Sequence, residues 1–133
     1  MDMEKQDYIV KLGMLQQEAE RISQEHQNIE RQINDLQSLK LNLEYFSNAK
    51  CNDALVSLGS GIYTKADMKG KGLWVNIGAN TVVKKSVSET NALIDEQISK
   101  LGKIKEQLSR EMELLNAQLN LLIEDARHAE ETS

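Results

Sequence analysis

Apolar residues recur in alternating steps of three and four along two long segments, one towards each end of the sequence. The first stripe runs through Tyr8, Leu12, Leu15, Ala19, Ile22, His26, Ile29, Ile33, Leu36, Lys40 and Leu43. The last stripe runs through Ile94, Ile98, Leu101, Lys105, Leu108, Met112, Leu115, Leu119, Leu122, Ala126 and Ala129. Such steps mark the core positions of a coiled coil. Two stripes of equal length around a short connector predict an antiparallel helical hairpin.

We expect one helix over residues 5–50 and another over residues 86–130, each roughly 65–70 Å long at 1.5 Å per residue. The second helix should start near Ser86, because Ser86 and Glu89 are spaced as in a capping box. The sequence contains no proline, which suits long unbroken helices. A long thin hairpin has no room for an enclosed active site, so this pattern favours a protein that holds or bridges other proteins.

Between the helices the apolar period changes to two, which predicts short strands over residues 54–58, 62–68, 73–77 and 81–85. Glycine-containing turns between them predict two consecutive β-hairpins, so the fold class is α+β and mainly α. Hairpins this small are marginal alone, and their edges need to be covered. We therefore predict an oligomer assembled through this segment. The residues expected to form the contact are Leu55, Val56, Ile62, Leu73, Val75, Ile77, Val82 and Val83.

Composition narrows the class of protein further. The 133 residues predict a single domain over 1–133, and one Phe, one Trp and three Tyr are few for a compact globular core. The net charge is −5, with acidic helical arms and a mildly basic middle, which argues against binding nucleic acid through its phosphates. Cys51 is the only cysteine, so no internal disulfide forms. With no signal-like or membrane-spanning stretch, these features predict a cytoplasmic location.

Two motifs in the middle segment resemble the alpha-type subunit of prefoldin. The stretch LVSLGSG at residues 55–61 is similar to the family's LVPLGAG, and WVNIGANTVVKK at residues 74–85 is similar to its second strand-turn-strand segment. The departures are Ser57 for proline, Asn76 for a small or acidic residue, Asn80 for glycine and Lys84 for glutamate. None of them removes a turn or the alternation. The order of long helix, two hairpins and long helix matches the family over nearly the whole chain.

The resemblance implies a hexamer of two alpha-type and four beta-type subunits, whose strands join into an intersubunit β-barrel that carries six coiled coils. It also implies a chaperone that holds unfolded client proteins without ATP and passes them to a group II chaperonin. Beta-type subunits have a single hairpin, so the two hairpins here indicate the alpha type.

Apolar residues outside the stripes gather near the two ends of the sequence. From Gln16 to Asp35 every residue outside the stripe is polar, whereas apolar residues break the pattern nearer the termini. An antiparallel hairpin would bring these residues together, and an exposed apolar patch on a polar rod marks an interaction site. The alternative is that they only widen the local core. As candidates for client binding we take Ile9, Val10, Met14, Leu121 and Ile123, with Leu114 nearby.

Other polar residues suggest structural roles. His26 on the first stripe is interpreted as a register-fixing polar residue rather than a metal ligand, because no second ligand is visible. Lys40 and Lys105 interrupt the stripes with stems that can pack. A lysine group could dock an acidic chaperonin surface, although solvated strand edges explain it more simply. This group comprises Lys65, Lys69, Lys71, Lys84 and Lys85.

No motif for catalysis, a metal or a cofactor is present, so we predict that the chain is not an enzyme and needs no cofactor. Two other functions remain as alternatives. A transcript-cleavage factor would need paired carboxylates at the closed end of the hairpin, where this chain has lysines and Asp67. A structural tether or filament subunit would use the same β segment for assembly without binding clients.

Overall fold

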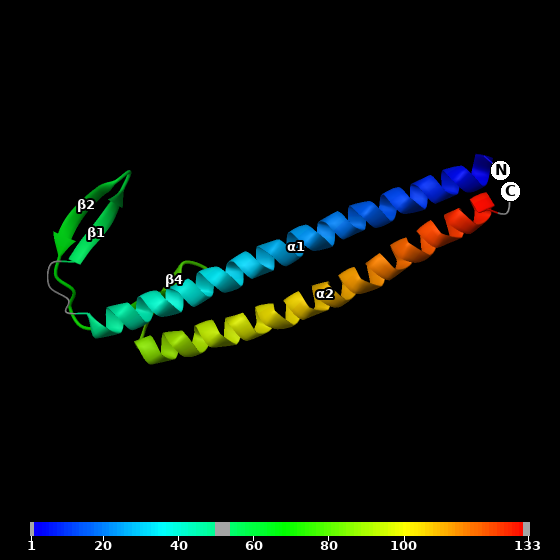
Figure 1. Ribbon diagram of the computed structural model, residues 1–133. Coiled ribbons are helices and arrows are strands. Elements are labelled where there is room, and N and C mark those ends of the chain that lie inside the picture. The colour runs from blue at the N-terminus through cyan, green and yellow to red at the C-terminus, as the bar shows by residue number, and fades with distance from the viewer. Residues whose placement is uncertain (1, 50–53, 132–133) are drawn as a thin grey trace. The chain divides into compact units, whose positions relative to one another are not determined.

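The computed structural model describes residues 2–49 and 54–131, and Cys51 lies outside this part of the chain. The element order is α1 (Asp2–Asn48), β1 (Ala54–Gly59), β2 (Ile62–Ala66), β3 (Leu73–Gly78), β4 (Thr81–Lys85) and α2 (Val87–Glu131). The predicted class, two long helices around two small hairpins, is confirmed (Figure 1). The boundaries differ slightly, since α1 begins at Asp2 and β2 ends at Ala66 rather than at Met68.

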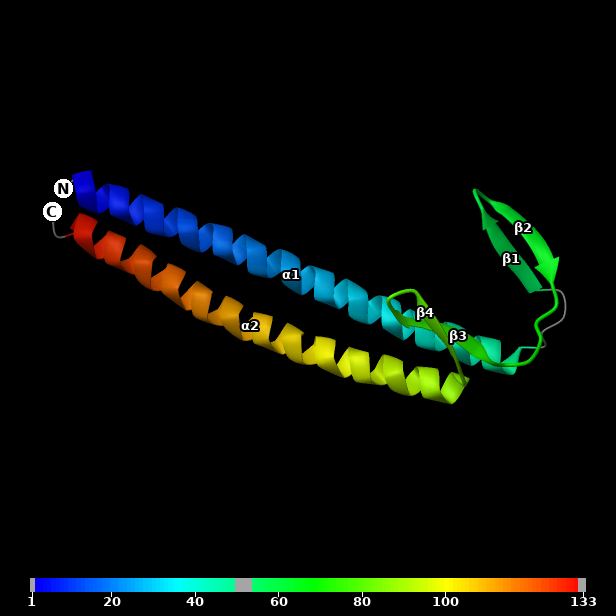
Figure 2. The same ribbon diagram turned by 180° about the vertical axis from the view of Figure 1, so that it is seen from behind.

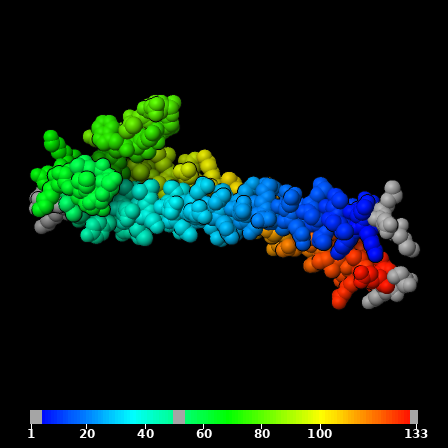
Figure 3. Space-filling model, turned by 90° about the horizontal axis from the view of Figure 1, so that it is seen from above, coloured from blue at the N-terminus to red at the C-terminus, as the bar shows by residue number. Residues whose placement is uncertain are grey.

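The chain divides into two compact units. The terminal unit contains the residues up to Ile33 and those from Ser99 onward, and the middle unit is Asn34–Ile98. Within the terminal unit, the first half of α1 and the second half of α2 run antiparallel beside each other, as both ribbon views show (Figures 1 and 2). The N-terminal turns of α1 and the C-terminal turns of α2 are adjacent in the space-filling view (Figure 3).

Packing between the helices follows the predicted stripes. In the terminal unit the core is formed by Ile22, Leu108 and Leu115, which are only 3%, 6% and 7% exposed. The residues packed against this core are Leu15, Ala19, Ile29 and Met112. Among the described residues of the middle unit, the buried apolar side chains are those of Leu43 and Ile94. All of these residues lie on the two stripes, because a seven-residue repeat keeps one face of each helix towards the other.

The start of α2 is fixed by the predicted cap. The Glu89 backbone N–H donates to Ser86 Oγ at 3.0 Å, and Ser86 Oγ donates in turn to Glu89 Oε1 at 3.1 Å. Thr90 Oγ1 donates to the Ser86 carbonyl at 2.8 Å, and the Thr90 residue is buried. The first of these bonds satisfies a backbone N–H at the helix N-terminus that has no partner within the helix, and the other two hold Glu89 and Thr90 against Ser86.

Each hairpin is a separate two-stranded antiparallel sheet, with β1 paired to β2 and β3 paired to β4. Both hairpins close with a two-residue loop in which both residues have positive φ, as a type I′ turn requires. In the first loop Ser60 and Gly61 have φ values of 51° and 77°, and in the second Ala79 and Asn80 have values of 50° and 59°. The right-handed twist of the strands favours this turn type.

Candidate functional site

A shallow groove of about 400 Å³ lies between the helices near the chain ends in the terminal unit. The residues that line this terminal groove are Lys11, Met14, Leu15, Gln118, Leu121, Leu122 and Asp125. Its floor is apolar, while a lysine and an aspartate border it. The antiparallel arrangement creates the groove, because residues more than a hundred positions apart in sequence face each other across the helix pair.

The structure brings together two of the predicted client-binding residues. Met14 and Leu121 both line the terminal groove and are 66% and 61% exposed. Ile9, Val10 and Ile123 are also exposed in the same terminal turns but do not line the groove. Sequence reasoning missed Leu15 and Leu122, because both lie on the stripes and were assigned to the core alone.

A polar layer crosses the helix pair in the terminal unit. His26 Nε2 lies 3.3 Å from Ser109 Oγ on α2, and His26 Nδ1 lies 3.8 Å from Glu30 Oε1. Lys105 Nζ pairs with the same Glu30 oxygen at 3.2 Å. The layer therefore joins two residues of each helix. A one-step slip of the helices would break its hydrogen bond and ion pair, which agrees with the register role expected for His26.

The exposure of the hairpins bears directly on the predicted assembly surface. Leu55, Ile62 and Ile77 are 67%, 60% and 59% exposed. Val56 and Val82 are also exposed, whereas Leu73, Val75 and Val83 are half-buried. Three further exposed residues, which sequence reasoning did not select, are Leu58, Tyr63 and Trp74.

Two of these three residues, Tyr63 and Trp74, lie on a face of their strand from which no residue was selected. Tyr63 pairs with Ser57, and Trp74 pairs with Lys84, so both lie on the faces opposite Val56 and Val75. Strands that are apolar on both faces are typical of sheets covered on both sides. Residues 2–49 and 54–131, which the structure describes, leave the side chains named above exposed, without such a cover.

The loop between the hairpins reaches back to α1. Lys71 Nζ donates to the Phe46 carbonyl at 2.7 Å and also to the Ala49 carbonyl, and it lies 5.1 Å from the centroid of the Phe46 ring. A cation is favourable there, because the carbonyls of the last helical turn have no partners within the helix. Lys71 thus has a structural role within its own chain. The lysines that could dock an acidic chaperonin surface are therefore the other four of the group.

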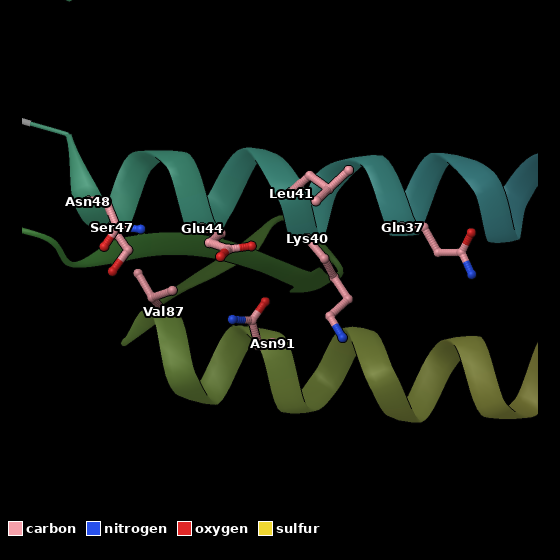
Figure 4. Close-up of a pocket in the computed structure, with 8 residues that line it drawn as sticks. All are labelled: Gln37, Lys40, Leu41, Glu44, Ser47, Asn48, Val87 and Asn91. Atoms are coloured by element: carbon pink, nitrogen blue, oxygen red, sulfur yellow. The ribbon is translucent and has the colours of Figure 1, made fainter.

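A second hollow of about 730 Å³ lies between the helices in the middle unit (Figure 4). Lys40 extends from α1 towards α2 and pairs with Asp95, as expected for a lysine whose stem packs while its ammonium reaches a polar partner. Val87 and Asn91 point from α2 towards α1 (Figure 4). Asn91 Oδ1 is buried and has no hydrogen-bond partner among the described residues.

Exposed apolar residues also occur on the helices of the middle unit. Tyr45 is 80% exposed and Leu41 is 67% exposed, with Leu39 and Leu93 less so. They were not predicted, because apolar residues outside the stripes were sought only over residues 16–35 and near the two termini.

No described residues form a cluster of three or more potential metal-ligating side chains. None of the described helices is long and apolar enough to span a membrane.

Comparison with known proteins gives one family. The family model for the prefoldin subunit matches residues 15–130. The prefoldin subunit alpha of Archaeoglobus fulgidus is 29% identical over 110 residues, which cover 81% of this chain and 80% of that protein. The prefoldin subunit alpha of Methanosphaera stadtmanae is 26% identical over 82 residues, covering 62% of this chain and 59% of that protein.

Among solved structures, a chain of the filamentous PFD of Methanocaldococcus jannaschii, determined by cryo-EM, has a similar fold. The TM-score is 0.52 at 21% sequence identity, and the match covers 94% of this chain and 99% of the other. At this identity the likeness concerns the fold alone.

Proposed function

Because the chain belongs to the prefoldin family, a family of chaperones, we propose that it is an alpha-type subunit that holds unfolded proteins without ATP. The observation that carries the proposal is the terminal groove, where Met14 and Leu121 expose apolar side chains on an otherwise polar helix pair. An unfolded client offers the apolar segments that such a groove would cover, and each buried side chain contributes roughly 1.5–3 kcal/mol.

One groove is too small to hold a client tightly. We propose that several coiled coils act together, so that weak contacts add up through high effective concentration. Assembly would be with other prefoldin subunits, two alpha-type with four beta-type, whose strands form a shared β-barrel with the hairpins described here. The exposed apolar hairpin residues support this part of the proposal. In this scheme the complex, located in the cytoplasm, delivers its client to a group II chaperonin.

Light scattering of a denatured, aggregation-prone protein tests the holdase. The chain is assembled with beta-type subunits and added without nucleotide, and we expect aggregation to be suppressed. The double variant Met14→Gln and Leu121→Gln should lose most of this protection. The matched control is Leu41→Gln, which changes a leucine of similar exposure in the middle unit. Equal protection by all three complexes would refute client capture at the groove.

The alternative is a structural tether or filament subunit without client binding. The filamentous relative named above makes this worth testing, although its likeness concerns the fold alone. A filament subunit would give long assemblies of the chain in negative-stain electron microscopy and no suppression of light scattering. A chaperone subunit would give closed particles and suppression.

A further inference from the structure

The lining of the terminal groove has the spacing of two helix faces. Its residues stand at positions i, i+3 and i+4 on α1 and at i, i+3, i+4 and i+7 on α2, and residues at these spacings are neighbours on a helix surface. Four apolar side chains surround its floor, namely those of Met14, Leu15, Leu121 and Leu122. A hollow between four such side chains is what one side chain of an adjoining helix fills in knobs-into-holes packing.

The described walls of the groove offer no backbone partner to a ligand. They belong to Asp2–Asn48 and Val87–Glu131, which are helical, so their backbone N–H and C=O groups are bonded within their own helices. A client segment in extended conformation would press its own backbone groups against the apolar floor, and each group left without a hydrogen bond weakens binding. A helical segment has these groups already paired, so that only its side chains meet the floor.

Opposite charges stand at one end of the groove. Lys11 on α1 and Asp125 on α2 are its lining residues nearest to the chain ends, where the two helices are adjacent (Figure 3). Both side chains are exposed, and neither forms an ion pair with another residue that the structure describes. A ligand with a carboxylate on one flank and an ammonium or guanidinium group on the other would therefore complement both walls.

We propose that the terminal groove binds client segments as amphipathic helices, in which an apolar stripe lies between an acidic flank and a basic flank, in preference to extended segments. The apolar stripe covers Met14 and Leu121, which are 66% and 61% exposed. The acidic flank faces Lys11 and the basic flank faces Asp125, and these charges set the direction of the helix because reversing it exchanges its flanks. This inference rests on the client capture proposed above and adds the conformation and the charge pattern of the client.

Three labelled peptides test the conformation of the ligand. The first spaces its leucines in steps of three and four between glutamates on one flank and lysines on the other. The second has the same composition in strict alternation of apolar and polar residues, and the third is the first with a central proline. Fluorescence anisotropy measures their binding to the full-length chain assembled with beta-type prefoldin subunits.

Binding at the groove is the part of this signal that is lost in the Met14→Gln and Leu121→Gln double variant. We expect the first peptide to bind the groove about tenfold more tightly than either of the others. The alternating peptide cannot place all its leucines on one helix face, and an interior proline disrupts the helix. Equal affinities of the three peptides for the groove would overturn the preference for helices.

A charge exchange tests the role of Lys11. The Lys11→Glu variant makes both walls acidic and keeps the apolar floor, and little packing is lost because Lys11 is exposed. At low salt the unaltered chain should prefer the peptide with mixed flanks over one with lysines on both flanks by about threefold. Lys11→Glu should reverse this preference. The matched control is Lys103→Glu, an exposed position of α2 that does not line the groove, where the preference should stay as it is.

The outcomes separate this inference from the proposed function. Suppression of light scattering together with equal binding of the three peptides would refute the helix preference and leave the chaperone role intact. No suppression and no peptide binding would refute client capture itself, and the inference with it. Sedimentation velocity detects the other possible occupant, a second copy of the chain. Association of complexes that disappears in the Met14→Gln and Leu121→Gln double variant would assign the groove to self-pairing and overturn the proposal.

Discussion

Two adjacent leucines on α2 provide a direct test of the helix packing. Leu115 is 7% exposed and belongs to the core of the terminal unit, whereas Leu114 is 67% exposed. Both stand in the same helix, in the same sequence context, and replacement of either by alanine removes the same atoms. The pair of variants Leu115→Ala and Leu114→Ala therefore isolates the effect of burial.

The expected magnitudes follow from the burial of each side chain. Buried leucine to alanine substitutions lower the free energy of unfolding by about 2–5 kcal/mol, depending on the cavity that remains. The seam of a two-helix hairpin is open to water along its sides, so little closed cavity can form, and we expect about 2–3 kcal/mol for Leu115→Ala. About a third of Leu114 is covered, so its contribution should stay below about 1 kcal/mol. The slightly higher helix propensity of alanine reduces this loss further.

Urea unfolding monitored by far-UV circular dichroism measures the difference. Protein concentration must be held constant, because assembly makes the apparent free energy of unfolding depend on it. A shift of the midpoint without a change of slope would show that stability alone has changed. Equal loss of stability in the two variants would refute the assignment of Leu115, and not Leu114, to the helix seam.

The remaining predictions concern single local features. Ser86→Ala should lower the free energy of unfolding by about 1 kcal/mol, because the first turn of α2 loses its cap, and Ser86→Gly should lose less in the same urea assay. Lys71→Met should cost about 0.5–1 kcal/mol by removing the cation at the end of α1; a cost that does not shrink at high salt would contradict the electrostatic explanation. Ala79→Gly should raise the free energy of unfolding by about 0.5–1 kcal/mol, because glycine adopts the observed φ of 50° without strain. A loss of stability in this variant would argue against the turn. The hydrogen bond from Arg21 lowers the pKa of Glu18 below its ordinary value, so this ion pair stabilises the fold above that value and is lost as the pH falls through the lowered pKa. An NMR titration of Glu18 in the Arg21→Gln variant should show the pKa rising, and an unchanged value would contradict this pairing.

Much of the fold follows from local periodicity. The buried apolar residues Ile22, Leu43 and Ile94 all lie on stripes that are visible in the sequence, because the heptad repeat encodes which helix face packs. The start of α2 is equally local, since Ser86 caps the helix through a residue three positions later. Glycines at regular positions likewise predicted both hairpin turns.

Features that depend on contacts distant in sequence were not predictable. The cap on α1 is supplied by Lys71, which lies 22 residues beyond Ala49, and no local motif announces it. The pairing of Met14 with Leu121 in one groove depends on the register of the two helices, which the polar layer around His26 helps to set. The positive φ of Ala79 was also missed, because alanine is not a typical residue for that conformation.

The single seam between the helices has a consequence for local motion. Among the described residues no side chain is less than 2% exposed, so the packing is only one layer deep. A layer of this kind breaks in small steps, and its outermost turns can separate while the inner ones stay closed. Amide hydrogen exchange should therefore slow gradually from the chain ends towards Ile22 and Leu108. Such breathing would let the same groove adapt its width to apolar segments of different size.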